Sequence, residues 1–326
     1  MRKRAFIGGA AMAMATSLVT LAPRRARAQD WPAKPIRILV SFAPGGLTDT
    51  IARALLPALQ EGFGQAVVIE NRPGAGGTVA EAALARSPAD GYTVLLSADS
   101  VPANPHLVPR LPYDTFKDLT PVSMLARIPL VMLVSNNVPA TSVKDFVALA
   151  RSGVKASYGS PGVGTSNHLY FEVFKDITGI DLPHVAYKGG GPAMTDLMGG
   201  HIQAMLISST LAVPQAVAGK VRALAVTSER RLAQLPNVPT FAEAGFPDFN
   251  PQQWTGLFVR AGTPPSIVAG IHKEFARALR SAEVRARLGE LNAEPVASSA
   301  AEFEAFLRRE TQTLGQLIKA RGITAQ

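Results

Sequence analysis

The sequence contains no cysteine, which excludes disulfide bonds, thiolate metal sites and cysteine nucleophiles. It also lacks histidines at the spacing of a metal site, because the five that it has are scattered along the chain. We therefore expect neither a metal nor a cofactor. The five are His106, His168, His184, His201 and His272.

Catalytic and nucleotide-binding motifs are missing as well. No Gly-Lys-Ser/Thr of a phosphate-binding loop occurs, and residues 74–79 resemble a dinucleotide fingerprint except that Val79 stands at the third glycine position. Gly159-Ser160-Pro161-Gly162 is not the Gly-x-Ser-x-Gly of a nucleophile elbow. Because no nucleophile is paired with a base, we predict that the protein is not an enzyme. An exported hydrolase built on Ser160 is the remote alternative.

The first 28 residues have the pattern of a secretory signal peptide. A basic start is followed by an uncharged stretch over residues 5–23 and by the small-residue site Ala26-Arg27-Ala28. We predict export to the periplasm with cleavage after Ala28, by either the general or the twin-arginine route. A membrane anchor is the weaker interpretation, because the stretch is rich in alanine and glycine.

Removal of this segment changes what the charge implies. The formal charge falls from +9 to +3, because six of the 33 basic residues and none of the 24 acidic ones lie in it. The remaining chain has no long basic run and no basic–aromatic stripe, so we expect no nucleic-acid partner. It has no second apolar stretch long enough to cross a bilayer, so the mature protein is predicted not to be membrane-embedded.

A glycine-rich turn near the mature start is the first candidate site. Residues 36–40 predict a strand, and apolar residues at 47, 51, 54, 55 and 58 predict a helix. Between them lies Ala43-Pro44-Gly45-Gly46. The first N–H groups of a helix have no partner inside it and favour an anion, and glycine lets the backbone approach a ligand. Asp49 is placed to reach back and hold the turn.

A second turn of the same kind follows about 115 residues later. Residues 156–158 predict a strand, residues 159–164 a glycine-rich loop, and Thr165 or Ser166 can cap a helix that runs through His168. We hypothesise that the two turns face each other across a cleft and share one small anion, a carboxylate. Each can also be an ordinary strand–helix turn, and His168 can serve the cap or the core instead of a ligand.

A third turn, Tyr187-Lys188-Gly189-Gly190-Gly191-Pro192, also bares helix N–H groups. Lys188 either neutralises an acidic ligand or is an ordinary surface lysine. Phe42 and Tyr187 are core aromatics or face the cleft, since each stands at the end of a predicted strand.

The order of strands and helices predicts an α/β protein with two lobes. Two β-α-β series are separated by extended segments, which we interpret as crossing strands that form a hinge. Each lobe is expected to hold a mostly parallel sheet flanked by helices. The predicted ranges are 30–125 with 254–326 for lobe 1, 136–250 for lobe 2, and about 125–135 and 250–260 for the hinge.

Motifs over nearly the whole mature chain resemble the periplasmic receptors of tripartite tricarboxylate transporters, the Bug-type receptors. They are Trp31-Pro32-Ala33-Lys34-Pro35-Ile36, Phe42-Ala43-Pro44-Gly45-Gly46-Leu47-Thr48-Asp49, Glu70-Asn71-Arg72-Pro73-Gly74-Ala75-Gly76-Gly77, Ala89-Asp90-Gly91-Tyr92-Thr93, Leu111-Pro112-Tyr113-Asp114, Gly159-Ser160-Pro161-Gly162-Val163-Gly164-Thr165-Ser166-Asn167-His168, Val185-Ala186-Tyr187-Lys188-Gly189 and Pro236-Asn237-Val238-Pro239-Thr240.

The resemblance implies a two-lobed, type II-like periplasmic binding protein that grasps one ligand carboxylate between the two glycine turns, partly through water. By motif, the ligand residues are Phe42, Gly45, Gly46 and Asp49 in lobe 1 and Ser160, Gly164, Thr165, Ser166 and His168 in lobe 2. Its partners are expected to be a small organic carboxylate and the membrane permease, and the receptor a monomer. Relatives usually carry an aspartate near Gln203, which leaves the roles of Gln203 and Ser208 open.

The identity and destination of the ligand also remain open. Citrate-like, dicarboxylate, amino-acid and aromatic acids all fit a clamp that grips one carboxylate. A sensor that docks on the ectodomain of a two-component kinase uses the same clamp and is the alternative to transport.

Overall fold

The computed structural model describes residues 31–324, so the predicted signal peptide lies outside the described residues. From Pro32 onward the described chain belongs to one compact unit. Its strands are β1 (Ile36–Val40), β2 (Val67–Asn71), β3 (Thr93–Ala98), β4 (Leu119–Val134), β5 (Tyr158–Ser160), β6 (His184–Ala186), β7 (Ala204–Ser208), β8 (Arg222–Val226), β9 (Gln252–Arg260) and β10 (Glu294–Pro295).

The helices alternate with these strands along most of the chain. They are α1 (Leu47–Phe63), the short 3-10 helix η1 (Ala75–Gly77), α2 (Thr78–Ala85), α3 (Asn104–Leu107), α4 (Thr115–Asp118), α5 (Val143–Arg151), α6 (Ser166–Thr178), α7 (Gly190–Gly199), α8 (Ser209–Val217), α9 (Pro265–Arg280), α10 (Ala282–Glu290) and α11 (Ala300–Arg321).

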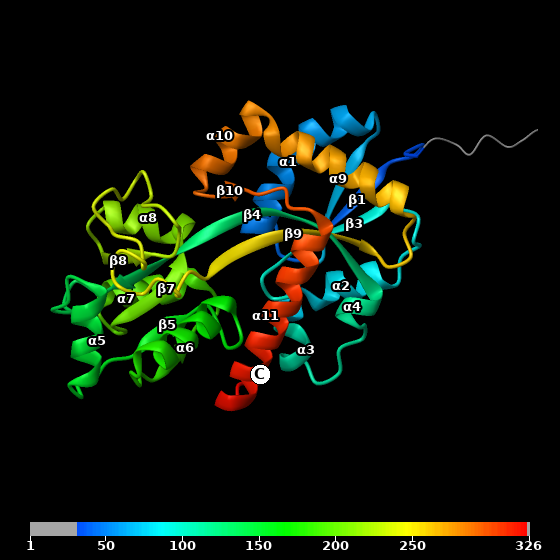
Figure 1. The fold of residues 1–326 in the computed structure, drawn as a ribbon. Coiled ribbons are helices and arrows are strands. Elements are labelled where there is room, and N and C mark those ends of the chain that lie inside the picture. Colours follow the sequence, from blue (N-terminus) through cyan, green and yellow to red (C-terminus); the bar gives the residue numbers. More distant parts are fainter. Residues whose placement is uncertain (1–30, 325–326) are drawn as a thin grey trace, which may run out of the picture. The chain divides into compact units, whose positions relative to one another are not determined.

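The strands form one sheet with the order β2-β1-β3-β9-β4-β7-β5-β6, and β8 and β10 pair with β4. β1 pairs in parallel with β2 and β3, which we name the first half-sheet. β5 pairs in parallel with β6 and β7, which we name the second half-sheet. The antiparallel strands β4 and β9 cross between the two halves (Figure 1). Two parallel half-sheets joined by two crossing strands match the predicted plan.

Because proline lacks the N–H for a ladder hydrogen bond, the sequence predicts that residue 129 does not occupy a central strand position. That prediction is wrong, because Pro129 lies inside β4, a 16-residue strand with neighbours on both sides. The physical reason is that Pro129 lies where β4 stops pairing with β9 and starts pairing with β7. Pro129 forms the last pair with β9, opposite Gln252, and Leu130 forms the first pair with β7, opposite Ser208. The missing N–H therefore falls where one hydrogen-bond ladder ends and the next begins.

The strand before the second turn is also shifted from its predicted place. β5 covers Tyr158–Ser160, so Gly159 and Ser160 belong to the strand and not to the loop. Parallel pairing extends it, because Gly159 lies opposite Val185 and Ser160 opposite Ala186. Local sequence does not reveal this, since glycine and serine are weak strand formers and the partner strand is distant in the chain.

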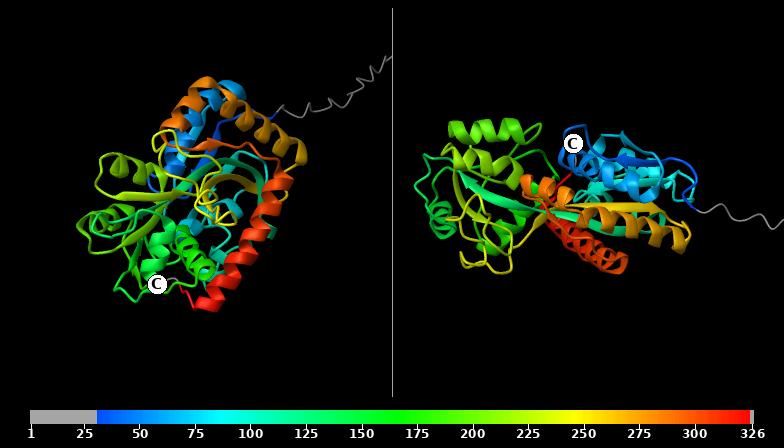
Figure 2. Two further views of the ribbon diagram at one scale, coloured as in Figure 1. Left: turned by 60° about the vertical axis from the view of Figure 1, so that its left-hand side comes forward. Right: turned by 90° about the horizontal axis from the view of Figure 1, so that it is seen from above.

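Buried apolar residues cover both faces of the sheet, and helices lie on each face (Figure 2). α11 belongs to the core of both halves. Near its start, Phe303 and Leu307 pack with Leu95 of β3 and Trp254 of β9. Near its end, Leu314, Leu317 and Ile318 join a cluster built on α6 and β7. One helix therefore stabilises the two halves together, and the exact lobe boundaries stay a prediction.

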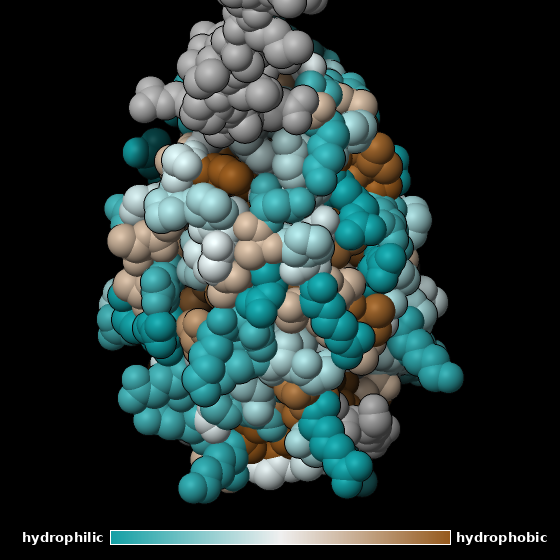
Figure 3. Space-filling model, turned by 90° about the vertical axis from the view of Figure 1, so that its right-hand side faces the viewer, coloured by the Kyte–Doolittle hydropathy of each residue, from teal (hydrophilic) through white to brown (hydrophobic). Residues whose placement is uncertain are grey.

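On the face shown in Figure 3, hydrophilic residues dominate and apolar ones lie in small separate groups. Among the described residues, no helix combines the length and apolarity needed to span a bilayer. Within the same residues, no three His, Asp or Glu side chains are grouped to hold a metal ion.

Candidate ligand-binding site

The first predicted turn connects β1 to α1 and is held from beneath by Asp49. Its buried carboxylate accepts from the Gly45 N–H at 2.8 Å, from Arg53 Nε at 2.8 Å and from Asn71 Nδ2 at 2.9 Å. Burial alone would raise the pKa of Asp49, but these hydrogen bonds outweigh it and hold the pKa below its usual value. The predicted role of Asp49 in holding the turn is confirmed, and ligand contact by Asp49 stays a prediction.

The turn leaves free donors at the start of α1. Gly45 has a φ of 79°, which favours glycine, and Gly46 is the N-cap with an extended backbone. No described residue accepts a hydrogen bond from the backbone N–H of Leu47 or Thr48. The Phe42 carbonyl accepts from Asn71 Nδ2 at 3.0 Å, which fixes the strand end, and ligand contact by Phe42 stays a prediction. The helix start is therefore rigid and presents donors in the way an anion requires.

The second turn is built on the same plan from different residues. Thr165, not Ser166, is the N-cap of α6, and its hydroxyl accepts from the His168 N–H at 3.4 Å. Gly164, with a φ of 75°, donates its N–H to His168 Nδ1 at 3.0 Å. The N–H groups of Ser166 and Asn167 have no acceptor among the described residues. A second helix start thus also offers unpaired donors.

Ser160 is buried beneath this turn and contacts a histidine that the sequence did not single out. Its hydroxyl donates to the Gly162 carbonyl at 2.9 Å and lies 2.7 Å from His184 Nε2. Which of the two groups donates in this contact depends on the tautomer of His184. Gly162 also donates its N–H to Ser160 Oγ at 3.2 Å, so Ser160 links the turn to β6.

A stack of rings supports the turn from below. The His168 and His184 rings are parallel with centroids 3.9 Å apart, and Tyr158 stacks on Phe171 at 3.8 Å. Burial, with a smaller contribution from His184, lowers the pKa of His168 to about 4. Burial also lowers the pKa of His184. Both imidazoles are neutral at pH 7, which suits a ring that accepts a backbone hydrogen bond.

Residues at the carboxyl end of β3 bring the second turn against the first half-sheet. Asp99 follows β3 directly, is buried, and lies beside Ser166 of α6 and Gln253 of β9. Burial raises its pKa to about 6, although Ser166 and Gln253 oppose the shift. A Cβ on Gly164 would lie 2.7 Å from Leu107 of α3. The start of α6 is therefore in contact with the end of β3 and with α3.

The first turn approaches the same place from the other side. A Cβ on Gly77 would lie 3.2 Å from Ser41 Cβ and 3.5 Å from Ser100 Oγ. Ser41 immediately precedes the first turn, and Ser100 follows Asp99. The buried Ser100 Oγ and Asp99 Oδ2 have no hydrogen-bond partner among the described residues. The two helix starts thus flank residues 99 and 100, which carry unsatisfied polar atoms. That both starts bind one ligand stays a prediction.

The third turn, residues 187–192, shows fewer features of a ligand site than the first two turns. Tyr187 donates its hydroxyl to Asp196 at 2.7 Å, and Lys188 is exposed with no ion pair among the described residues. Gln203 lies at the amino end of β7, where its Oε1 accepts from the Ser157 N–H at 2.9 Å. Ser208 lies at the opposite, carboxyl end of β7 and caps α8. Of these two, only Ser208 is at the sheet edge where ligands of such folds bind.

The family model for the tripartite tricarboxylate transporter family receptor matches residues 51–323. The chain belongs to this receptor family. The match begins just after the first turn and includes the second. The receptor is 36% identical to the protein BugT of Bordetella pertussis over 299 residues, which cover 90% of this chain and 91% of BugT.

Solved structures confirm the fold of the receptor. A Rhodopseudomonas palustris protein solved with adipate is 34% identical, with a TM-score of 0.78, and covers 91% of this chain and all of its own. MatC from the same organism, solved with bound malate, is 32% identical, with a TM-score of 0.74, and covers 88% of this chain and 99% of its own. The fold is that of a two-lobed α/β periplasmic binding protein.

Three residues of the candidate site escaped the sequence analysis of this receptor. Asp99 carried a usable signal, because it lies two residues after the strand that residues 92–97 predict, at the edge where ligands bind. His184 was noticed only as a scattered histidine, since its contact with Ser160 depends on the register of β5 with β6. Gln253 was missed because it lies in a crossing strand, β9, to which the sequence assigned only a hinge role.

Proposed function

We propose that this receptor captures a small organic carboxylate between the starts of α1 and α6 and delivers it to the permease of a tripartite tricarboxylate-type transporter. One observation carries the proposal. Both helix starts present backbone N–H groups that no described residue accepts from, at Leu47 and Thr48 on α1 and at Ser166 and Asn167 on α6. The relatives solved with adipate and malate support the ligand class.

The expected strength of such a clamp is sufficient for a receptor. A hydrogen bond to a charged group contributes about 1.5–3 kcal/mol. Four of them give about 6–12 kcal/mol before the costs of ordering, and micromolar binding needs about 8 kcal/mol. The grip on a single carboxylate thus supplies most of the affinity, and the remainder of the pocket selects the ligand.

A thermal-shift screen with adipate, malate, citrate and benzoate tests the ligand class, with butylamine as a cationic control. A ligand at 100 times its Kd adds about 2.7 kcal/mol of stability. For a chain of this size that raises the Tm by roughly 4 °C. If none of these anions raises the Tm, carboxylate capture is refuted.

The remaining parts of the proposal have separate tests. Closure of the lobes about β4 and β9 predicts a smaller radius of gyration in X-ray scattering once the ligand is added. Export predicts a mature protein that begins at Gln29, by intact mass of the periplasmic form. Delivery to a permease predicts that uptake of the ligand by cells fails when the receptor gene is deleted and returns with the wild-type gene. Uptake that is unchanged by the deletion would favour a sensory role.

A further inference from the structure

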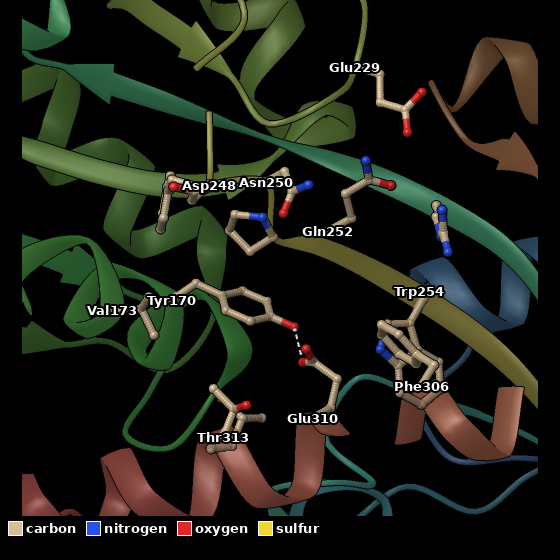
Figure 4. Close-up of a pocket in the computed structure, with 14 residues that line it drawn as sticks. Tyr170, Val173, Glu229, Asp248, Asn250, Gln252, Trp254, Phe306, Glu310 and Thr313 are labelled. Atoms are coloured by element: carbon tan, nitrogen blue, oxygen red, sulfur yellow. Dashed lines mark hydrogen bonds between the residues drawn. The ribbon is translucent and has the colours of Figure 1, made fainter. Parts of the chain in front are cut away.

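A cavity of about 270 Å³ lies beside the crossing strands β4 and β9 and is lined by Gln252 and Trp254 but not by Gln253. Arg127 of β4 and Trp254 of β9 are directly opposite each other across the two strands and both line it. Tyr170 of α6 and Glu310 of α11 close the cavity from the helical side (Figure 4). Residues of both halves of the molecule therefore build it.

Two buried polar atoms at this cavity lack partners. Trp254 is 1% exposed, and its Nε1 donor has no acceptor among the described residues. Gln252 Oε1 is buried nearby on the same strand and has no donor there. A buried donor or acceptor left unpaired costs about 1–3 kcal/mol, so such atoms are rare in native proteins. A bound molecule that accepts from Trp254 and donates to Gln252 removes both costs.

The charged side chains of the cavity are also left without ion pairs. Arg127 donates from Nε only to the weak acceptor Met124 Sδ at 3.3 Å, and no carboxylate of the described chain lies within ion-pair distance of it. Glu310 accepts from the Tyr170 hydroxyl at 3.1 Å and has no cation partner there. Burial raises the pKa of Glu310, which a cation beside it would counteract. Glu229 and Asp248 also line the cavity and have no ion pair in the described chain. The cavity thus offers one unmatched cation, Arg127, and three unmatched carboxylates, of which Glu310 is the one hydrogen-bonded to Tyr170.

Size and walls limit what can fill this space. A volume of about 270 Å³ equals that of roughly nine water molecules at about 30 Å³ each, which fits an organic molecule of about ten non-hydrogen atoms. The rings of Trp254, Phe306 and Tyr170 provide apolar surface (Figure 4). The occupant must therefore be small, partly apolar, and able to carry opposite charges at neighbouring atoms.

We propose that this cavity is a second binding site, for a free amino acid with an apolar side chain. Its carboxylate binds Arg127 and Trp254 Nε1, its ammonium group binds Glu310 and Gln252 Oε1, and its side chain packs against Phe306. This site is separate from the clamp at α1 and α6 and does not depend on the proposed function.

The fluorescence of Trp254 provides a direct measurement. The chain has two tryptophans, so a Trp31→Phe parent leaves Trp254 as the single reporter. L-Leucine is titrated into this parent and compared with 4-methylpentanoate and 3-methylbutylamine, which each keep one of its two charges. A saturable change with leucine, and binding at least tenfold weaker for both single-charge analogues, is the expected result. The absence of any change with leucine, or equal binding of an analogue, overturns the proposal.

Variants locate the leucine. Arg127→Gln and Glu310→Gln are each expected to weaken leucine at least tenfold, and Arg110→Gln, which alters an exposed arginine elsewhere, is expected to leave it unchanged. Gly46→Val is expected to retain the leucine response. If the response is lost in Gly46→Val, the leucine acts through the clamp and the proposal fails. Should Arg127→Gln not fold, Glu310→Gln and the analogue comparison still decide.

Discussion

Replacing Gly46 by valine tests the clamp at its first helix start. The backbone of Gly46 has a φ of −70°, which any residue adopts, so the substitution causes no strain of the main chain. A Cβ there would lie 3.1 Å from the Ala43 carbonyl oxygen and 3.8 Å from Phe42 Cβ. The carbonyl must therefore move by a few tenths of an ångström, and we expect a loss of less than about 1.5 kcal/mol in the free energy of unfolding.

The effect on binding is expected to be much larger. Gly46 directly precedes Leu47 and Thr48, whose N–H groups are free, so we expect the added methyl groups to block the approach of a ligand carboxylate and remove up to two hydrogen bonds. At about 1.5–3 kcal/mol each, this amounts to about 3–6 kcal/mol, or a Kd weaker by a factor of roughly 10² to 10⁴. Isothermal titration calorimetry with the carboxylate found in the thermal-shift screen measures it, and circular dichroism melting checks the fold.

Gly289→Val is the matched control, because Gly289 is an exposed glycine of α10 with open space where the Cβ would stand. It is expected to bind the carboxylate like the wild type. A folded Gly46→Val protein with unchanged affinity would remove the first helix start from the site. If Gly46→Val does not fold, Gly46→Ala makes the same test with a smaller side chain.

Three further variants test the supports beneath the site. Burial lowers the pKa of His168 to about 4 from an unfolded value near 6.5, so wild-type stability falls by up to about 3 kcal/mol as the pH drops from 6.5 to 4. In urea unfolding, the free energy of unfolding of His168→Gln should change less between pH 6.5 and pH 4 than that of the wild type. An equally steep pH dependence contradicts the lowered pKa of His168. Lys175→Met removes the ammonium group that lies 3.0 Å from the buried carboxylate of Glu172. It should lower the free energy of unfolding in urea by about 3 kcal/mol. A loss below about 1 kcal/mol would contradict a stabilising role for this ion pair. The pKa of Asp49 is lowered, so its stabilisation is present above pH 3.8 and is lost as the pH falls through the folded pKa. Asp49→Asn should cost about 1.5–3 kcal/mol at pH 7 and remove that acid-dependent loss, which melting curves at pH 7 and pH 3 will check.

Features set by neighbouring residues were predictable from the sequence. The helix capped by Ser142 ends at Arg151 as expected, because the serine and Asp145 form a capping box within one turn. The first strand also matches its predicted bounds, residues 36–40. The two glycine turns were found for the same reason, since a strand, a glycine-rich loop and a helical period follow each other directly.

Features set by distant partners were not predictable in this way. The place of Pro129 inside β4 depends on where β9 ends and β7 begins. The contact of Ser160 with His184 depends on the register of two short strands. The burial of Asp99 against Ser166 depends on the packing of one half of the molecule on the other. Each of these needs a pairing that no single stretch of sequence specifies.

The change of partner within β4 has a mechanical consequence. The ladder to β9 stops at Pro129 and the ladder to β7 starts at Leu130, so a twist concentrated at that one peptide leaves both sets of interstrand bonds intact. We therefore expect the two halves to rotate about β4 at this point, if the lobes close on a ligand as proposed. Such a rotation breaks few interstrand hydrogen bonds, so it costs little of the free energy of ligand binding. The affinity would then be set mainly by the contacts of the ligand itself.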